Sequence, residues 1–222
     1  MATRTFISLE NKLAANVPGC PRPTIEQFVR DTAIEVCEKT LVWRFEQEII
    51  PLTAGVYEYD YEVPTESEVV AIIHSALLED NTFKETLKPV SQEDLHRLYP
   101  DWPSADTTKR SSPRVLSQFD PDHFVLAPVP DAAHIYSIKM FLALRPTPTA
   151  TGMDKTAMDE VEQLITHGVL QHLHTIPDKS WTDYGVASYH AKQYTYKTAA
   201  RRAKANLGVA RASLTAQMRP LE

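Results

Sequence analysis

The chain has 222 residues, a formal net charge of −6 and only two cysteines, Cys20 and Cys37. This length can hold one large domain or a helical body with a β insertion, and two cysteines make a disulfide framework unlikely, which favours synthesis in a reducing cytosol. The six glycines lie more than ten residues apart, which excludes the closely spaced glycines of phosphate-binding loops, dinucleotide-binding turns and nucleophile elbows.

The N-terminal part predicts an arm followed by one long helix. Residues 1–16 mix charged with apolar side chains and therefore lack a signal-peptide stretch, and no run of about 18 apolar residues predicts a membrane span. Thr24 and Gln27 form a capping box, after which apolar residues recur at helical spacing. The pattern predicts a helix over residues 25–41, which ends just before Trp43.

After Trp43 the periodicity changes to that of β-strands. Residues 45–52 lead through a turn at residues 53–55 to tyrosines that alternate with acidic residues over residues 57–61, a pattern that predicts a half-buried hairpin. Further strands are predicted over residues 69–78, 83–87, 114–119, 123–129 and 134–144. Several short strands at this spacing predict an antiparallel sandwich. Ser91 and Asp94 predict the cap of a short helix that follows the strand over residues 83–87, and residues 100–113 predict an exposed loop.

Helical periodicity returns after a proline-rich linker over residues 146–151. Thr156 and Asp159 predict the start of a helix that ends before Pro177, and Ser180 and Asp183 predict the start of the next one. Gly208 is a plausible stop for this last helix. Trp181, between the two helices, is expected to be a buried core anchor.

Together these elements predict an α+β fold. A helical body, made of the N-terminal helix and the two C-terminal helices, carries an inserted antiparallel β-sandwich-like domain and an extended C-terminal tail. The expected divisions are residues 1–42 for the arm and first helix, 43–150 for the β domain, 151–208 for the rest of the helical body and 209–222 for the tail. The tail is too short and polar to hold a core of its own.

Basic residues are concentrated at the C-terminal end of the chain. From Lys192 onward there are seven basic residues and one acidic residue, Glu222, whereas the first 191 residues carry 16 basic and 28 acidic ones. Such asymmetry is typical of a tail that meets an acidic surface or phosphates. The alternative, for Arg201, Arg202 and Lys204, is a solvated helix end whose positive charge the helix dipole favours.

The histidines give little support for a metal site or an active site. His172 and His174 are two residues apart on the predicted helix. Their side chains therefore point about 200° apart and cannot chelate one ion as a pair. His167 shares a face with His174, but only glutamines accompany them there. The sequence has no HExxH or Cys-x-x-Cys motif and no triad signature, so we expect a polar helix face toward solvent or a neighbouring subunit and no catalytic, cofactor-binding or metal-binding residues.

The order of these signals resembles one family, the head-to-tail adaptor proteins of tailed bacteriophages, which form a ring beneath the portal. The resemblance covers about residues 23–196 and lies in the order and spacing of several segments rather than in one motif. These segments are Glu35-Val36-Cys37 to Trp43-Arg44, Gly55 before Tyr59, Tyr61 and Pro64, Leu126 to Pro130, Ile138 to Pro146, Ile165-Thr166-His167-Gly168 to Trp181-Thr182-Asp183, and Ala187, Tyr189 and Tyr194.

The resemblance implies a non-enzymatic virion protein of the neck, made in the cytoplasm of the bacterial host. It implies a ring of about twelve copies, partners in the portal protein and in a tail, nozzle or stopper protein, and genome DNA that passes non-specifically through the lumen. No cofactor and no membrane is implied. The C-terminal segment would dock onto the portal. The residues expected to dock are Arg201, Arg202, Lys204, Arg211, Leu214, Met218 and Arg219.

Two other classes of function stay open from the sequence. The alternating tyrosines of residues 57–61 suit a carbohydrate-binding β-sandwich module, although tyrosines on one strand face are ordinary in a sandwich. A small hydrolase is the weaker alternative, because the chain contains Ser, His and Asp residues but no signature that groups them.

Overall fold

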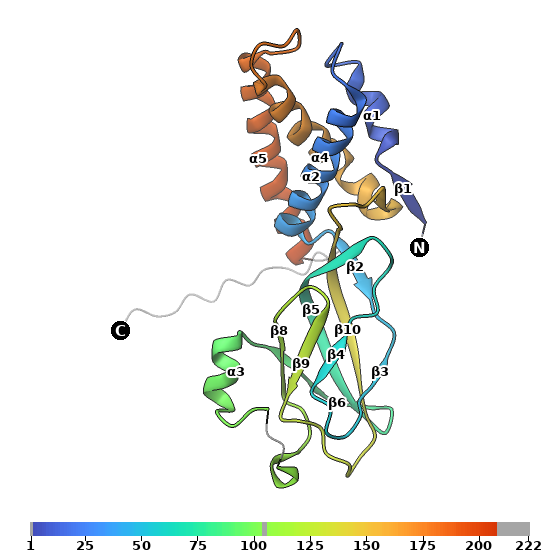
Figure 1. Cartoon of the computed structure of the whole chain (residues 1–222), viewed down its shortest axis with the longest axis vertical. Helices are drawn as coiled ribbons and strands as arrows, with labels where there is room; N and C mark the ends of the chain where they lie inside the picture. The colour runs from blue at the N-terminus through green and yellow to red at the C-terminus, as the bar shows by residue number, and fades with distance from the viewer. Residues whose placement is uncertain (1, 104–105, 208–222) are drawn as a thin grey trace, which may run out of the picture.

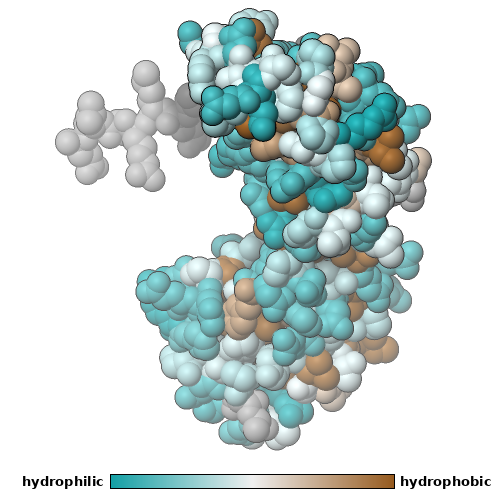
Figure 2. Space-filling view, turned by 45° about the horizontal axis from the view of Figure 1, so that its top comes forward, coloured by the Kyte–Doolittle hydropathy of each residue, from teal (hydrophilic) through white to brown (hydrophobic). Residues whose placement is uncertain are grey.

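The computed structural model describes residues 2–103 and 106–207, and it confirms the predicted α+β class. The long helices gather at one end of the long axis and most strands at the other, where the short helix over residues 92–98 also lies (Figure 1). We call these two parts the helical lobe and the β lobe, and the space-filling view shows a narrower part between them (Figure 2). Among the helices described, none has the length and apolar composition needed to cross a membrane.

The helical lobe consists of α1 (Ile7–Ala14), α2 (Arg22–Thr40), α4 (Lys155–Thr175) and α5 (Tyr184–Leu207). α5 packs against α4 and α2, and α1 packs against the same two helices from the opposite side (Figure 1). The three long helices meet closely at Gly168 of α4. A Cβ atom at Gly168 would lie 2.5 Å from Cγ2 of Thr32 and 2.9 Å from Cε2 of Tyr194.

The three long helices were expected from periodicity, but the start of each differs from the prediction. α2 begins at Arg22, after Pro21, and has Pro23 in its first turn. No side chain caps this end, so the predicted capping box at Thr24 and Gln27 is wrong. Asp154, rather than Thr156, caps α4, because its side chain accepts a hydrogen bond from the amide of Ala157. α5 begins at Tyr184, later than predicted: the amide of Val186 donates to Asp183 at 3.0 Å, whereas Ser180 bonds the carbonyl oxygen of Pro18 and does not cap the helix.

The β lobe contains two sheets, and its larger sheet has five strands. β10 (Tyr136–Pro146) is its central strand and pairs along its length with β5 (Ser67–Glu79). On the other side of β10 lie β2 (Trp43–Glu46) and β3 (Ile50–Pro51), and β6 (Thr82–Thr86) forms the edge beyond β5. All pairs in this sheet are antiparallel.

The smaller sheet has the strand order β4-β9-β8-β7. Its strands are β4 (Glu58–Asp60), β7 (Lys88–Pro89), β8 (Val115–Gln118) and β9 (His123–Ala127), and only the β7–β8 pair is parallel. The predicted short helix is α3 (Gln92–Leu98), which Ser91 caps as expected. A 3-10 turn, Thr107–Lys109, lies in the predicted loop.

The hairpin predicted over residues 45–61 is wrong. β2 and β3 pair with β10 of the larger sheet, whereas β4 pairs with β9 of the smaller one. The turn therefore carries the chain from one sheet to the other instead of joining neighbouring strands. The tyrosine alternation has a different cause: the rings of Tyr59 and Tyr61 pack against Phe124 of β9, with ring centroids 5.8 and 5.1 Å apart.

A continuous hydrophobic core joins the two lobes. Its buried members include Leu77 and Ile138 of the larger sheet, Phe124 of the smaller sheet, and Val36 and Val169 of the helical lobe. Residues of both sheets in one core agree with the predicted sandwich. Leu95 of α3 belongs to a second, smaller cluster on the other side of the smaller sheet.

The expected N-terminal arm contains two elements that the periodicity did not predict. β1 (Thr3–Thr5) pairs antiparallel with β11 (Gly152–Asp154), the strand just before α4, and α1 follows it. α1 has only eight residues and no side-chain cap, so its sequence signal is weak. Its buried Leu9 and Leu13 complete the core beside α2.

Candidate assembly surfaces

The structure describes three of the seven residues expected to dock onto a partner, and all three lie near the end of α5. Arg202 and Lys204 are exposed. Arg201 instead turns inward: its side chain is 17% exposed and forms an ion pair with Glu160 of α4. Burial, and next the nearby charge of Arg44, lowers the pKa of the Arg201 guanidinium. Arg201 therefore fixes α5 to α4, and the outward basic charge comes from its neighbours.

The other expected docking residues lie outside the described residues. They are Arg211, Leu214, Met218 and Arg219, together with the whole tail of residues 209–222 and the predicted helix stop at Gly208.

α5 presents an unusual exposed face above this basic end. Tyr189 and Tyr196 are 56% and 73% exposed, although tyrosine rings usually pack against other residues. The helix contains five basic residues and no Asp or Glu. Of the residues that helical periodicity places on one stripe of α5, Ala187 and Tyr194 are buried, whereas Tyr184 is 63% exposed. The outer side could not be recognised from the sequence, because it is defined only once the inward stripe is known.

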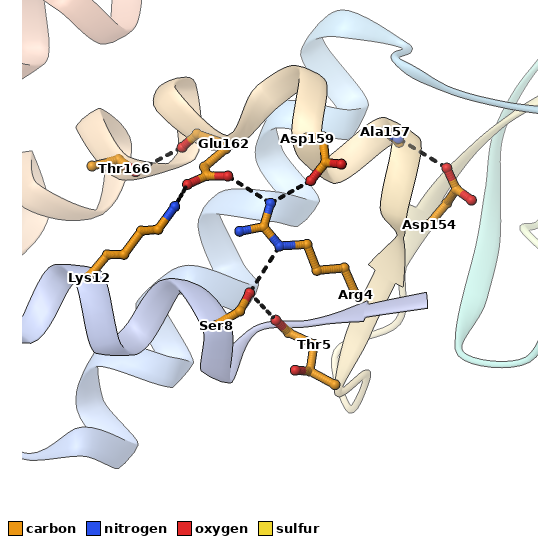
Figure 3. A network of polar contacts seen from close by, with 9 residues as sticks. All are labelled: Arg4, Thr5, Ser8, Lys12, Asp154, Ala157, Asp159, Glu162 and Thr166. Carbon is orange, nitrogen blue, oxygen red and sulfur yellow. Dashed lines mark hydrogen bonds and ion pairs between the residues drawn. The ribbon is translucent and has the colours of Figure 1, made fainter. Parts of the chain in front are cut away.

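A network of charged side chains ties the N-terminus to α4 (Figure 3). Arg4 of β1 lies between two carboxylates of α4, with Nη1 2.5 Å from Asp159 and 2.7 Å from Glu162. Lys12 of α1 also bonds Glu162. The hydrogen bonds from Arg4 and Lys12 lower the pKa of the Glu162 carboxyl. Together with the β1–β11 pair, this network fixes the N-terminal segment to the helical lobe.

His167 and His174 of α4 face α5 or the loop before it in the same chain, which overturns the expected solvent or subunit contact. Nδ1 of His167 lies 2.8 Å from Nδ1 of His190, a residue of α5 that the sequence analysis missed. His174 is buried, and its Nδ1 lies 2.6 Å from the carbonyl oxygen of Trp181. His172 points elsewhere, as expected, and stacks on Phe28. The histidines lie inward because α5 folds back along α4 and covers that face.

The His167–His190 contact requires that one ring donates and the other accepts, so both cannot be protonated while it exists. Burial and nearby positive charges, Lys197 for His167 and His174 for His190, lower the pKa of both histidines. A lowered pKa in the folded state means that the unfolded state binds protons more tightly. The stability of the protein should therefore fall as pH drops through the ordinary histidine value, near about 6.5, toward the lower folded pKa values.

We expect the melting temperature of the wild-type protein to decrease between neutral pH and about pH 5.5. Replacing His190 with phenylalanine should flatten this decrease, because the pair no longer exists to be protonated. His172→Gln, at an exposed histidine of the same helix bundle, is the control and should keep the wild-type slope. A His190→Phe variant with an unchanged pH slope would contradict this role of the pair.

The described residues offer little for chemistry. Within residues 2–103 and 106–207, no group of three or more His, Cys, Asp or Glu is arranged to hold a metal ion. Cys37 lies in the core, where burial raises its pKa to about 12. The tyrosines proposed as a carbohydrate platform are also occupied: Tyr61 is buried, and the hydroxyl of Tyr59 bonds the backbone of Thr53.

Trp181 is only partly buried, which corrects the expectation of a fully buried anchor. It packs against the core from the loop between α4 and α5, where a Cβ atom at Gly19, in the loop before α2, would lie 3.8 Å from its ring.

The structure thus combines two lobes on one core, an N-terminal strand fixed to the helical lobe and an exposed basic helix end. Comparison with known families identifies the class. The family model described as SU10 adaptor protein matches residues 4–221, nearly the whole chain. The chain therefore belongs to the SU10 adaptor protein family, which confirms the resemblance to the adaptors of tailed bacteriophages. No curated protein matches the chain.

Proposed function

We propose that this protein is the head-to-tail adaptor that joins the portal of a bacteriophage capsid to its tail, nozzle or stopper protein. The match to an adaptor family over residues 4–221 carries this proposal. Copies of the chain close head to tail into a ring of about twelve. Genome DNA passes through the lumen without sequence-specific contacts, and the protein resides in the virion neck and has no catalytic activity.

The C-terminal segment is proposed to attach each copy to the portal. It begins where α5 ends, and the basic residues Arg202 and Lys204 are already exposed at that point. Residues 209–222 add Arg211 and Arg219 and end in one acid, Glu222. A segment of this kind that folds as it binds would make attachment depend on a portal surface that already exists.

Deleting residues 209–222 should abolish attachment to the portal and leave the fold unchanged. The core of the described residues extends only to Tyr194, so the melting temperature should stay at the wild-type value. Attachment is measured by co-sedimentation of the purified protein with portal rings, and electron micrographs of the mixture show whether the rings gain a second layer.

A finer variant, Arg211→Ala combined with Arg219→Ala, tests the charge of the segment alone. Its matched control removes two exposed arginines of the β lobe, Arg97 and Arg114. The control should attach normally. Normal attachment of the truncated protein would show that the docking role lies elsewhere in the chain.

A further inference from the structure

The outer face of α5 carries a regular seam of exposed residues. Six residues follow one another at alternating spacings of four and three, which places them on one side of the helix. They are Gly185, Tyr189, Lys192, Tyr196, Ala199 and Ala203, and all six are exposed. We call this set the α5 seam.

A second row of residues with the same spacing lies on the inner side of α5, where it packs against other helices. It consists of Ala187, Ala191, Tyr194, Thr198 and Arg201, which are buried or half-buried against α2 and α4. Tyrosines and alanines thus pack against helices on the inner side, and the α5 seam repeats this composition toward the outside. Tyrosine and arginine are also enriched in the buried centres of protein interfaces.

The charge of α5 indicates what kind of surface fits the seam. The helix holds five basic residues and no acidic one, so the rest of the chain carries 18 basic and 29 acidic residues. Lys192, Arg202 and Lys204 are exposed, and no ion pair among the described residues involves them. Outside α5, a second copy of the chain therefore carries an excess of acidic over basic residues.

The same charges argue against contact between two α5 helices. A two-fold contact would place the same basic face on both sides, with no carboxylate on either helix to compensate the repulsion. A contact between α5 and a different surface of the next copy avoids this repulsion. In a head-to-tail contact each copy keeps one of its two contact surfaces free. Such contacts therefore continue from copy to copy and close into a ring where the rotation between copies permits.

The arrangement of the helical lobe is compatible with such a chain of contacts. α5 forms one edge of the lobe and α1 lies on the other side of α2 and α4 (Figure 1). A copy bound through its α5 seam keeps its opposite side free for the seam of another copy.

We infer that the α5 seam is one half of a head-to-tail contact between copies of this chain, with Tyr189 and Tyr196 as its anchors and an acidic surface of the next copy as its partner. This inference rests on the ring of the proposed function, to which it assigns a surface. It also states that the contact forms between free copies, before any other virion protein is bound.

The test compares two double variants of the full-length protein. Tyr189→Glu combined with Tyr196→Glu places two acids in the seam, whereas Ser188→Glu combined with Thr195→Glu places two acids, equally seven residues apart, on a neighbouring exposed face of α5. Sedimentation over a concentration series, up to millimolar protein, measures self-association. Circular dichroism and melting temperature confirm that each variant is folded.

We expect the wild type to self-associate, more strongly at low salt, and the seam variant to lose about 30-fold or more in affinity. The control variant should stay close to wild type. A wild type that remains monomeric at millimolar concentration overturns the inference, and so does a folded seam variant that associates normally.

Mixing wild type with a charge-neutral seam variant, Tyr189→Ala combined with Tyr196→Ala, separates the two geometries without adding acids that would pair with a basic seam. In a head-to-tail contact the variant still offers its second surface, so native mass spectrometry should detect dimers with one wild-type and one variant copy. An α5-to-α5 contact needs an intact seam on both copies, so the variant would enter no complex. Exclusion of the variant from all complexes therefore overturns the inference.

A basic face with tyrosines could instead bind nucleic acid, and the same variants address this outcome. Loss of affinity for a double-stranded DNA fragment in the seam variant, with unchanged self-association, overturns the inference. The proposed function is tested separately by attachment to portal rings, so portal attachment can fail while the seam contact holds, and the reverse.

Discussion

Replacing Gly168 with leucine should prevent the three long helices from packing. Gly168 is buried in the middle of α4, where even a Cβ atom would lie 2.5 Å from Thr32 of α2 and 2.9 Å from Tyr194 of α5. Both neighbours are buried, so neither can move aside without displacing its own helix. Overpacking in a core costs about 1 to 3 kcal/mol for small additions, and a leucine side chain adds several atoms beyond that first contact.

We therefore expect Gly168→Leu to lose at least about 3 kcal/mol of unfolding free energy or to fail to fold. Denaturant unfolding followed by circular dichroism measures the loss. Gly185→Leu is the matched control, since Gly185 is exposed on α5 and a Cβ atom there would have one near neighbour, Oδ1 of Asp183 at 3.2 Å. Leucine has a higher helix propensity than glycine, so the control should keep its stability. Similar stability losses in both variants would show that the close approach at Gly168 does not set the effect.

Replacing Trp43 with alanine should be the second most damaging change. Trp43 begins β2, directly after α2, and is 4% exposed within the core that both lobes share. It also lines a cavity of about 280 Å³ with Glu66 and Met153, so the lost ring would enlarge an existing space. Truncation of a buried tryptophan costs about 3 to 5 kcal/mol.

Trp43→Phe separates the ring from its N–H group. The indole nitrogen of Trp43 is buried and has no hydrogen-bond partner among the described residues, so phenylalanine keeps an aromatic ring and removes an unpaired donor. We expect a loss well below that of alanine, measured by denaturant unfolding. Trp102→Ala, in the smaller cluster beside α3, should cost less than Trp43→Ala. A Trp43→Ala protein as stable as wild type would show that the lobes do not depend on this contact.

The helices and most strands could be predicted because each follows a local pattern. The apolar spacing of α2, α4 and α5 is visible in any window of the sequence. Strand partners could not be predicted in the same way. β2 and β4 lie close in sequence, yet β2 pairs with residues about a hundred positions away in β10. The tyrosines that suggested a hairpin are explained by Phe124, which lies far along the chain.

The candidate surfaces could likewise be predicted only in part from the sequence. The basic character of α5 is a property of composition and was visible in the sequence. That Arg201 turns inward depends on Glu160, and that His167 faces His190 depends on the return of α5 along α4. No signal in a single sequence reports such contacts between helices, and the shared face of His167 and His174 was accordingly expected to meet solvent or a neighbouring subunit.

The passage between the lobes also has a mechanical consequence. The chain crosses it twice, in β2 and in β10, and these two segments are hydrogen-bonded to each other from Trp43↔Leu144 to Glu46↔Phe141. β10 runs along the long axis of the molecule (Figure 1). Tension along that axis pulls both segments in the same direction, so it loads in shear the hydrogen bonds between β10 and β5, which pair from Tyr136↔Glu79 to Pro146↔Ser67. Arg145 adds a second link between the lobes, because it bonds Glu38 of α2 and Glu68 of β5 together. A force that pulls β10 out of the β lobe must therefore break a long row of hydrogen bonds together instead of opening them one after another.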